Sequence, residues 1–153
     1  MTDKVEFQFK TPEESPGYLL AQLTLLWQRK QKKALDPLDL THTQFVLLTS
    51  VAWLSNTADA ITQAEIADFN NFDRMMVSKV LRTLETKKLI TRQGHKTDTR
   101  SKVVKLTPGG KEILQSALRK VESADIEFFS GLGPGLSAFN SGMLKLITQN
   151  KEV

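Results

Sequence analysis

The 153-residue sequence contains no cysteine. Disulfide bonds, thiolate catalysis, cysteine-ligated zinc or iron–sulfur sites and a cysteine redox switch are therefore all excluded. Histidine is scarce as well, with two residues, and the sequence shows neither a glycine-rich phosphate loop nor paired carboxylates at a catalytic spacing. These absences predict a protein that is not an enzyme and that needs no cofactor or metal.

Long apolar segments are also missing. No run of roughly eighteen consecutive apolar residues occurs, and residues 1–12 mix acidic and basic side chains where a signal peptide would be basic and then apolar. We therefore expect a cytoplasmic protein with no membrane partner. Hydrophobic residues make up 40% of the chain, which is enough for the core of a single domain over residues 1–153.

Positive charge is concentrated in one segment of the sequence. Residues 74–105 contain ten Lys or Arg and two Asp or Glu, a net charge of +8, whereas the rest of the chain has 11 basic and 15 acidic residues, a net charge of −4. A basic segment in an otherwise acidic chain favours binding to a polyanion. The alternative is a solvated charged face that has no partner.

Capping signals and helical periodicity predict helices on both sides of this segment. The first is expected from the Ser15-Pro16 cap to about Leu35, and the second begins at the capping box Thr41–Gln44. Thr107-Pro108 starts a long helix with an apolar stripe that has few partners within the chain, and a last helix follows the break at 131–135.

Between these helices the sequence predicts a helix-turn-helix and a β-hairpin. The capping box Thr62–Glu65 begins a short helix, and Asp73 caps the next one. Two capped helices joined by a tight turn are typical of a helix-turn-helix. The β-prone runs 89–92 and 102–106 predict a hairpin, or wing. The second helix of a helix-turn-helix is called the recognition helix. Here it is the helix that Asp73 caps, and it has an apolar stripe formed by Val77, Val80, Leu81 and Leu84.

Five short motifs follow one another through this part of the chain. They are Thr62-Gln-Ala-Glu-Ile-Ala, Ser78-Lys-Val-Leu-Arg-Thr-Leu-Glu85, Leu89-Ile-Thr-Arg92, Asp98-Thr-Arg100-Ser-Lys and Leu106-Thr-Pro-Gly-Gly, preceded upstream by Leu40-Thr-His-Thr-Gln-Phe45. In order and spacing, the chain resembles the MarR (multiple antibiotic resistance regulator) family, and with the flanking helices the resemblance covers nearly the whole chain.

The resemblance implies a mainly α fold with a small β-wing. A winged helix-turn-helix DNA-binding lobe is expected at about 61–107, and dimerisation helices at about 15–35 and 108–150. The implied function is that of a sequence-specific transcriptional regulator, a repressor, which binds double-stranded DNA at a pseudo-palindromic operator as a homodimer. The rival interpretation is a winged-helix protein–protein interaction module that acts on another regulator, although the basic face of the recognition helix argues against it.

The expected DNA contacts lie on three elements. They are Arg74, Met75, Ser78, Lys79 and Arg82 on the recognition helix, Thr62 and Gln63 at the start of the preceding helix, and Lys96, Asp98 and Arg100 in the wing. The recognition helix is expected in the major groove, the helix start at a phosphate, and the wing arginine, held by the wing aspartate, in the minor groove. The alternatives are a solvated helix surface, core packing for Met75 and Met76, a simple cap for the threonine and a surface salt bridge in the wing.

The resemblance also implies a pocket for a small aromatic effector near Trp27, His42 and Phe45. The alternative is that the tryptophan and the phenylalanine are core residues and that the histidine is an ordinary side chain at a helix start. The chain departs from the family pattern in two places. Lys88 stands where a glycine usually ends the recognition helix, which predicts a strained or altered helix end. Asn70 stands in the helix-turn-helix turn where a small apolar residue is usual, so Phe69 and Phe72 are expected to bury there.

Overall fold

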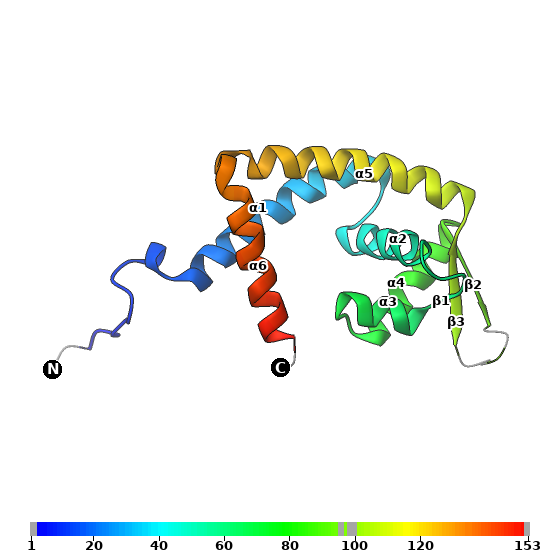
Figure 1. Ribbon diagram of the computed structural model, residues 1–153, viewed down its shortest axis with the longest axis horizontal. Helices are drawn as coiled ribbons and strands as arrows, with labels where there is room; N and C mark the ends of the chain where they lie inside the picture. Colours follow the sequence, from blue (N-terminus) through cyan, green and yellow to red (C-terminus); the bar gives the residue numbers. More distant parts are fainter. Residues whose placement is uncertain (1–2, 95–96, 98–100, 152–153) are drawn as a thin grey trace.

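The computed structural model describes residues 3–94, 97 and 101–151, and its elements are labelled in Figure 1. The helices are α1 (Pro16–Leu35), α2 (His42–Leu54), α3 (Gln63–Asn70), α4 (Arg74–Thr86), α5 (Pro108–Phe129) and α6 (Leu136–Asn150), and the 3-10 turns are η1 (Pro12–Glu14), η2 (Asp36–Leu38) and η3 (Ser130–Gly135). The strands are β1 (Ile61–Thr62), β2 (Ile90–Gly94) and β3 (Lys102–Leu106). None of the described helices is both long and apolar enough to cross a membrane.

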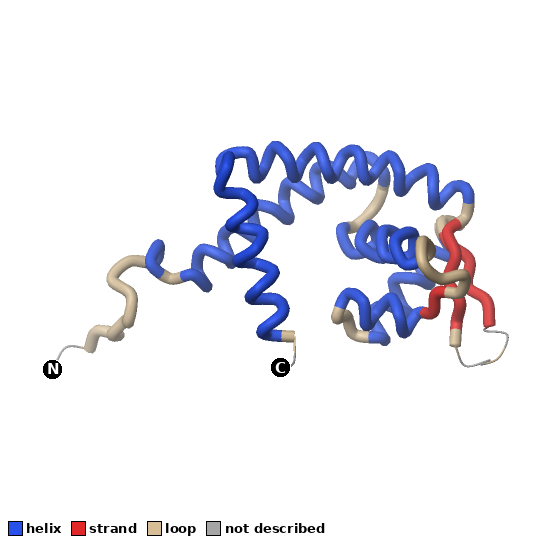
Figure 2. The backbone as a smooth tube through the Cα atoms, viewed as in Figure 1, coloured by secondary structure: helices blue, strands red, loops and turns tan. Residues whose placement is uncertain are grey.

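The molecule consists of a lobe and a set of longer helices. Helices α1 and α5 pack against each other along one side, and α6 folds back from the far end of α5 (Figure 1). The lobe contains α2, α3, α4 and the three strands, and the sheet lies at its edge farthest from α6 (Figure 2). This arrangement confirms the predicted fold class, a mainly helical chain with a small β-wing.

Each predicted helix cap is formed. The side chains of Ser15, Thr41, Thr62, Asp73 and Thr107 each accept a hydrogen bond from a backbone N–H in the first turn of their helix. In the two capping boxes the partner side chain also accepts from the backbone of the cap residue, at 3.1 Å in both cases. Because these bonds satisfy amides that a helix start leaves free, the predicted helix starts are correct.

The sheet has three antiparallel strands in the order β1-β3-β2. The predicted hairpin pairs Ile90 with Leu106 at one end and Gly94 with Lys102 at the other. Strand β1 was not predicted from the sequence, because two residues are too short to show a periodic pattern. It pairs Ile61 with Val104, and both side chains are buried.

The core occupies the lobe and the first half of α5. The α4 stripe is confirmed, since Val77, Leu81 and Leu84 are fully buried and Val80 packs against the core. Its partners include Leu47, Leu48 and Val51 of α2, Ile66 of α3, and Leu114, Ala117 and Val121 of α5. Helix α6 has no buried residue, and α1 buries only Gln31 and Leu35. The longer helices therefore leave much of their apolar surface uncovered within one chain.

Helix α4 ends in the conformation that glycine usually supplies. Lys88 has a φ of 63°. Its N–H donates to the Glu85 carbonyl at 2.9 Å and the Leu89 N–H donates to the Leu84 carbonyl at 3.0 Å, the bonding pattern of a left-handed helix end. The helix end thus keeps its usual shape, and the lysine carries the strain of a left-handed backbone.

The turn between α3 and α4 differs from the expectation. Phe69 is 51% exposed, so the prediction that it buries is wrong, whereas Phe72 does pack against the core. The Asn70 side-chain amide donates to the Ser50 hydroxyl at 2.8 Å and to the Ile66 carbonyl at 2.9 Å. A polar residue replaces the small apolar one because α2 supplies a hydroxyl partner for it.

Candidate nucleic-acid interface

The outer face of α4 carries the residues predicted to contact DNA. Burial of the apolar stripe turns the opposite face outward, so Arg74, Lys79 and Arg82 are exposed and Ser78 is half-buried. Met75 is 82% exposed, which excludes core packing for this residue. Its neighbour Met76 is partly buried against the core. A shallow hollow runs along this face, and it is lined by Asp73, Met75, Met76, Ser78, Lys79 and Arg82.

A second hollow joins three elements of the lobe. It is lined by Thr62, Gln63, Ala64, Arg74, Ser101 and Lys102, so the start of α3, the start of α4 and the base of the wing share one surface. The Thr62 hydroxyl accepts from the Glu65 N–H at 3.2 Å, which confirms the cap, and the half-buried first turn of α3 lines the hollow. Free N–H groups at a helix start favour an anion such as phosphate.

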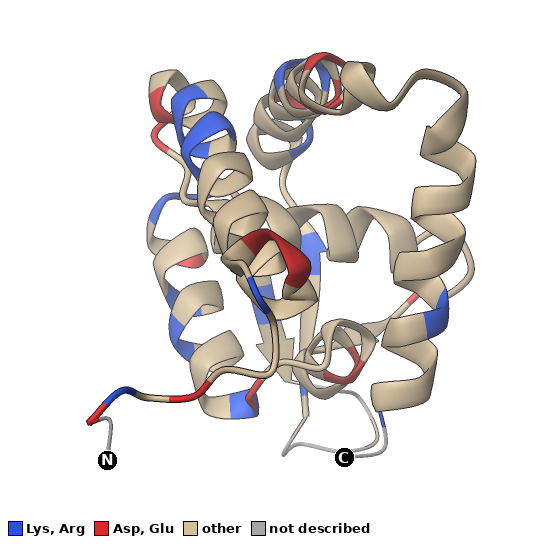
Figure 3. Ribbon diagram, turned by 90° about the vertical axis from the view of Figure 1, so that its left-hand side faces the viewer, with Lys and Arg blue, Asp and Glu red and all other residues tan. Residues whose placement is uncertain are grey.

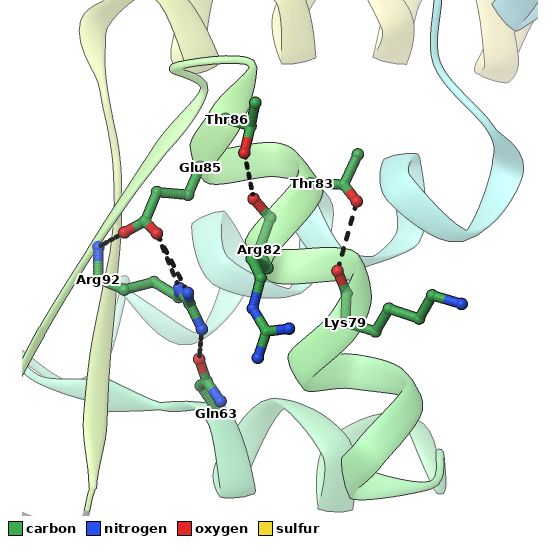
Figure 4. A network of polar contacts seen from close by, with 7 residues as sticks. All are labelled: Gln63, Lys79, Arg82, Thr83, Glu85, Thr86 and Arg92. Atoms are coloured by element: carbon green, nitrogen blue, oxygen red, sulfur yellow. Dashed lines mark hydrogen bonds and ion pairs between the residues drawn. The ribbon is translucent and has the colours of Figure 1, made fainter.

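Arg92 connects the wing to helices α3 and α4 (Figure 4). From β2 it donates through Nη1 to Gln63 Oε1 at 2.9 Å and through Nη2 to Glu85 Oε1 at 3.1 Å, and its backbone N–H donates to Glu85 Oε2 at 3.2 Å. The arginine side chain is only 14% exposed. Its hydrogen bonds hold the pKa of the Glu85 carboxyl below the ordinary value. This network fixes the angle between the wing and α4.

Some basic side chains of the lobe are paired with a carboxylate, and others have no such partner among the described residues. Arg92 is neutralised by Glu85, and Arg74 Nη2 lies 3.4 Å from Asp68 Oδ1 on the surface. Lys79 and Arg82 form no ion pair with any described residue, and Figure 4 shows both extending from α4. Basic residues recur along α4, whereas α6 is largely uncharged (Figure 3). Within α4, the positive charge that has no partner among the described residues therefore lies on the outward face, at Lys79 and Arg82.

The three predicted wing residues, Lys96, Asp98 and Arg100, lie outside the described residues. No positioning role was predicted for Arg92 or Glu85 from the sequence, although both residues belong to the motifs named above. Their contact could have been predicted from the sequence, because an acidic residue on the recognition helix and a basic residue on the following strand have opposite charges on two elements that were expected to be neighbours. The hydrogen bond that the Gln63 side-chain carbonyl accepts from Arg92 was likewise not predicted. This bond shows that the Gln63 side chain helps to hold the wing.

The three residues predicted to form an effector pocket do lie together. The Trp27 and His42 rings meet edge to face with centroids 5.0 Å apart, and the His42 and Phe45 centroids are 6.4 Å apart. Phe45 is buried in the core, whereas Trp27 is only half-buried. Burial lowers the pKa of His42 below its ordinary value, against an opposing effect of Asp125. The contact with Trp27 and the lowered pKa distinguish His42 from a fully solvated side chain, and its role in an effector pocket stays a prediction.

Two further residues of this cluster were missed. Asp125 Oδ1 accepts from Trp27 Nε1 at 2.9 Å and from Gln31 Nε2 at 2.7 Å, which joins α5 to α1. The sequence offered no local signal for this contact, because the partners are more than ninety residues apart. Within the described ranges, no three His, Asp or Glu side chains gather as metal ligands would.

Comparison with known proteins decides the family. The MarR family model matches residues 40–102. An uncharacterized HTH-type transcriptional regulator, YdcH of Bacillus subtilis (strain 168), is 46% identical over 123 residues, which cover 80% of this chain and 84% of that protein. This chain belongs to the MarR family. It is accordingly a transcriptional regulator of the winged helix-turn-helix class.

Solved structures of the family match this MarR-family chain over most of its length. The S. aureus MepR–DNA complex has a TM-score of 0.80 at 25% identity, and the match covers 88% of this chain and 98% of MepR. The transcriptional repressor CouR of Rhodococcus jostii RHA1, bound to a 23-mer DNA duplex, also has a TM-score of 0.80 at 25% identity, with 94% and 99% coverage.

Proposed function

We propose that this MarR-family regulator is a repressor that binds a pseudo-palindromic operator as a homodimer. The observation that carries the proposal is the outward face of α4, where Lys79 and Arg82 have no ion-pair partner among the described residues. A helix fits the major groove, and an unpaired basic side chain there is free to donate to guanine or phosphate. MepR and CouR, which share the fold, were solved in complex with DNA, and this supports DNA as the partner.

The remaining interface residues complete the proposed contacts. Met75, fully outward, would pack against thymine methyl groups, and Ser78 would donate to a base edge or phosphate. The first turn of α3, with Thr62 and Gln63, would hold a phosphate. Arg74 would reach a second phosphate by exchanging its weak surface pair with Asp68. In the wing, Arg100 supported by Asp98 would enter the minor groove, with Lys96 near the backbone.

The homodimer is proposed from the uncovered apolar surface of α1 and α6. The exposed side chains are Leu19, Leu20, Leu25 and Leu26 of α1 and Met143, Leu144, Leu146 and Ile147 of α6. Burying such surface in a second copy stabilises it, and a two-fold dimer presents two α4 helices about one DNA turn apart. Residues 15–35 and 108–150 are therefore proposed as the dimerisation helices. A light-scattering mass of a single chain at micromolar concentration would contradict this.

Release from DNA is proposed to depend on a small aromatic ligand bound near Trp27, His42 and Phe45. These side chains lie where α1, a long helix, meets α2, a helix of the DNA-binding lobe. A ligand inserted at this junction would change the angle between the lobe and the long helices. In a dimer such a change alters the spacing of the two recognition helices and lowers affinity for the operator.

Fluorescence polarisation with the DNA that flanks the gene tests the proposal. Lys79→Ala and Arg82→Ala are compared with Lys120→Ala, which removes an exposed charge from α5, far from the interface. We expect the first two to weaken binding about tenfold or more and to reduce the salt dependence by about one phosphate contact. The control should bind like the wild type. Absence of binding at low salt would favour the alternative, a protein-interaction module that acts on another regulator.

A further inference from the structure

A polar and aromatic cluster occupies the junction of α1, α2 and α5. Its members are Trp27 and Gln31 of α1, His42 and Phe45 of α2, and Asp125 of α5. We propose that this cluster recognises a cationic aromatic amine and discriminates against aromatic carboxylates. The inference rests on the proposed release by an aromatic ligand and specifies the chemical class of that ligand.

The cluster contains one uncompensated negative charge. Asp125 is half-buried, and both donors that reach it, Trp27 Nε1 and Gln31 Nε2, are neutral and bind Oδ1. Among the described residues no hydrogen bond or ion pair reaches Oδ2. The amine of Lys30, the residue before Gln31, is paired with Glu127, 3.1 Å away. A half-buried carboxylate without a cation is costly, so an incoming cation gains more here than on an open surface.

The cluster also has more hydrogen-bond acceptors than donors. The Gln31 side chain is fully buried, and its Oε1 has no hydrogen-bond partner. The amide cannot simply be reversed, because that would place Oε1 against the Asp125 carboxylate and lose the bond at 2.7 Å. The two side chains joined by this bond thus each keep one acceptor without a partner among the described residues, Gln31 Oε1 and Asp125 Oδ2. A ligand with N–H groups would donate hydrogen bonds to these acceptors, whereas a carboxylate would add further acceptors that also lack a donor.

The aromatic rings favour the same ligand. The ring centroids of Trp27 and His42 are 5.0 Å apart, and those of His42 and Phe45 are 6.4 Å apart. Because burial lowers the pKa of His42, this ring is neutral near pH 7 and does not compete with the ligand for Asp125. Neutral aromatic faces attract cations, most strongly at tryptophan. An arylalkylammonium combines an apolar ring with the charge and donors that the cluster requires.

There is open space beside the cluster. His42 and Gln28, the neighbour of Trp27, line a solvent-open hollow of about 600 Å³. The two lysines of its wall do not reverse the local charge, because Lys32 is paired with Asp36 at 2.8 Å and Lys87 with Asp39 at 3.4 Å. A ligand in this hollow would contact His42, the member of the cluster that lines it.

Isothermal titration of the full-length protein with three matched probes tests the proposal. The probes are 2-phenylethylammonium, 3-phenylpropionate and the neutral 2-phenylethanol. Asp125→Asn keeps the shape and an acceptor for Trp27 and Gln31 but removes the charge. Glu122→Gln, at an exposed position one turn away on α5, is the control that changes the net charge equally.

We expect the ammonium probe to bind at least about tenfold more tightly than the other two, and Asp125→Asn, but not Glu122→Gln, to abolish that preference. Equal or tighter binding of the carboxylate or the alcohol, no binding of the ammonium at millimolar concentration, or a preference that survives Asp125→Asn would overturn the proposal. The three-probe comparison needs only the wild type, so it remains decisive if a variant misfolds.

DNA binding is measured separately on the same preparations. A chain that binds its flanking DNA but rejects the ammonium refutes this inference and leaves the proposed function standing. A chain that binds the ammonium through Asp125 but does not bind DNA refutes the proposed function. If both bind, addition of the ammonium should raise the Kd for DNA in the wild type and leave it unchanged in Asp125→Asn.

Discussion

Gly110, in the first turn of α5, lies against Leu89, just beyond the end of the recognition helix. A Cβ added at this position would lie 1.9 Å from the Leu89 carbonyl oxygen and 2.9 Å from the carbonyl carbon. Leu89 links α4 to β2, and its carbonyl also accepts from the Thr107 N–H at 3.0 Å. Gly110→Ala therefore forces the α5 backbone away from a carbonyl that is held in place.

The structure gives a magnitude for this substitution. An ordinary carbon–oxygen contact is about 3.3 Å, so the two backbones must separate by about 1.4 Å. Overpacking of this kind costs about 1–3 kcal/mol, and breaking the Thr107–Leu89 hydrogen bond adds about 1 kcal/mol. We expect Gly110→Ala to lower the free energy of unfolding by about 3 kcal/mol, which for a chain of this size lowers the Tm by about 6–12 °C.

The adjacent glycine supplies a matched control. A Cβ at Gly109 would meet only the Thr107 hydroxyl, at 3.8 Å, so Gly109→Ala should be neutral or stabilise the helix by up to about 1 kcal/mol. Both variants are compared by urea and thermal unfolding followed by circular dichroism, at equal protein concentration because dimerisation affects the midpoint. If Gly110→Ala unfolds within about 1 kcal/mol of Gly109→Ala, the close packing of α5 on Leu89 is incorrect.

Three further predictions concern the lobe. Lys88→Gly should raise the free energy of unfolding by about 0.5–1 kcal/mol in urea, because glycine adopts a positive φ without strain; no gain would contradict the left-handed helix end. Arg92→Ala should weaken DNA binding and speed amide exchange in β2, since the wing loses its ties to Glu85; unchanged exchange would show that the hairpin holds itself. Since the pKa of His42 is lowered on folding, the unfolded chain takes up a proton more readily than the folded one, and stability should fall as the pH drops through the ordinary pKa of 6.5. The change is measured by urea unfolding, and His42→Gln should reduce it; an equal loss in both proteins would refute the role of this histidine.

Local signals in the sequence predicted most of the fold. The capping boxes at Thr41 and Thr62 act within three residues, so their sequence pattern and their hydrogen bonds coincide. The apolar stripe of α4 likewise predicted which face is buried and, by elimination, which face carries Lys79 and Arg82. These predictions succeeded because spacing along a helix determines direction in space.

Features that depend on distant partners were missed or wrong. Asn70 was treated as a misfit in an apolar turn, because the hydroxyl of Ser50 that satisfies it lies twenty residues away. The Gln31–Asp125 contact and the two-residue strand β1 likewise have no local pattern. Periodicity indicates that a side chain turns inward but does not indicate which residue it contacts, so only Trp27, His42 and Phe45 of their cluster were predicted from the sequence.

The most direct test of a dimeric repressor is a hydroxyl-radical footprint of the wild-type protein on the DNA that flanks its gene. We expect protection that is symmetric about a dyad, with two major-groove contacts about one helical turn apart, and both should need at least about tenfold more protein in Lys79→Ala and Arg82→Ala. A single asymmetric patch, or protection that needs no more protein in either variant, would contradict the assignment of α4 as the helix that enters the groove.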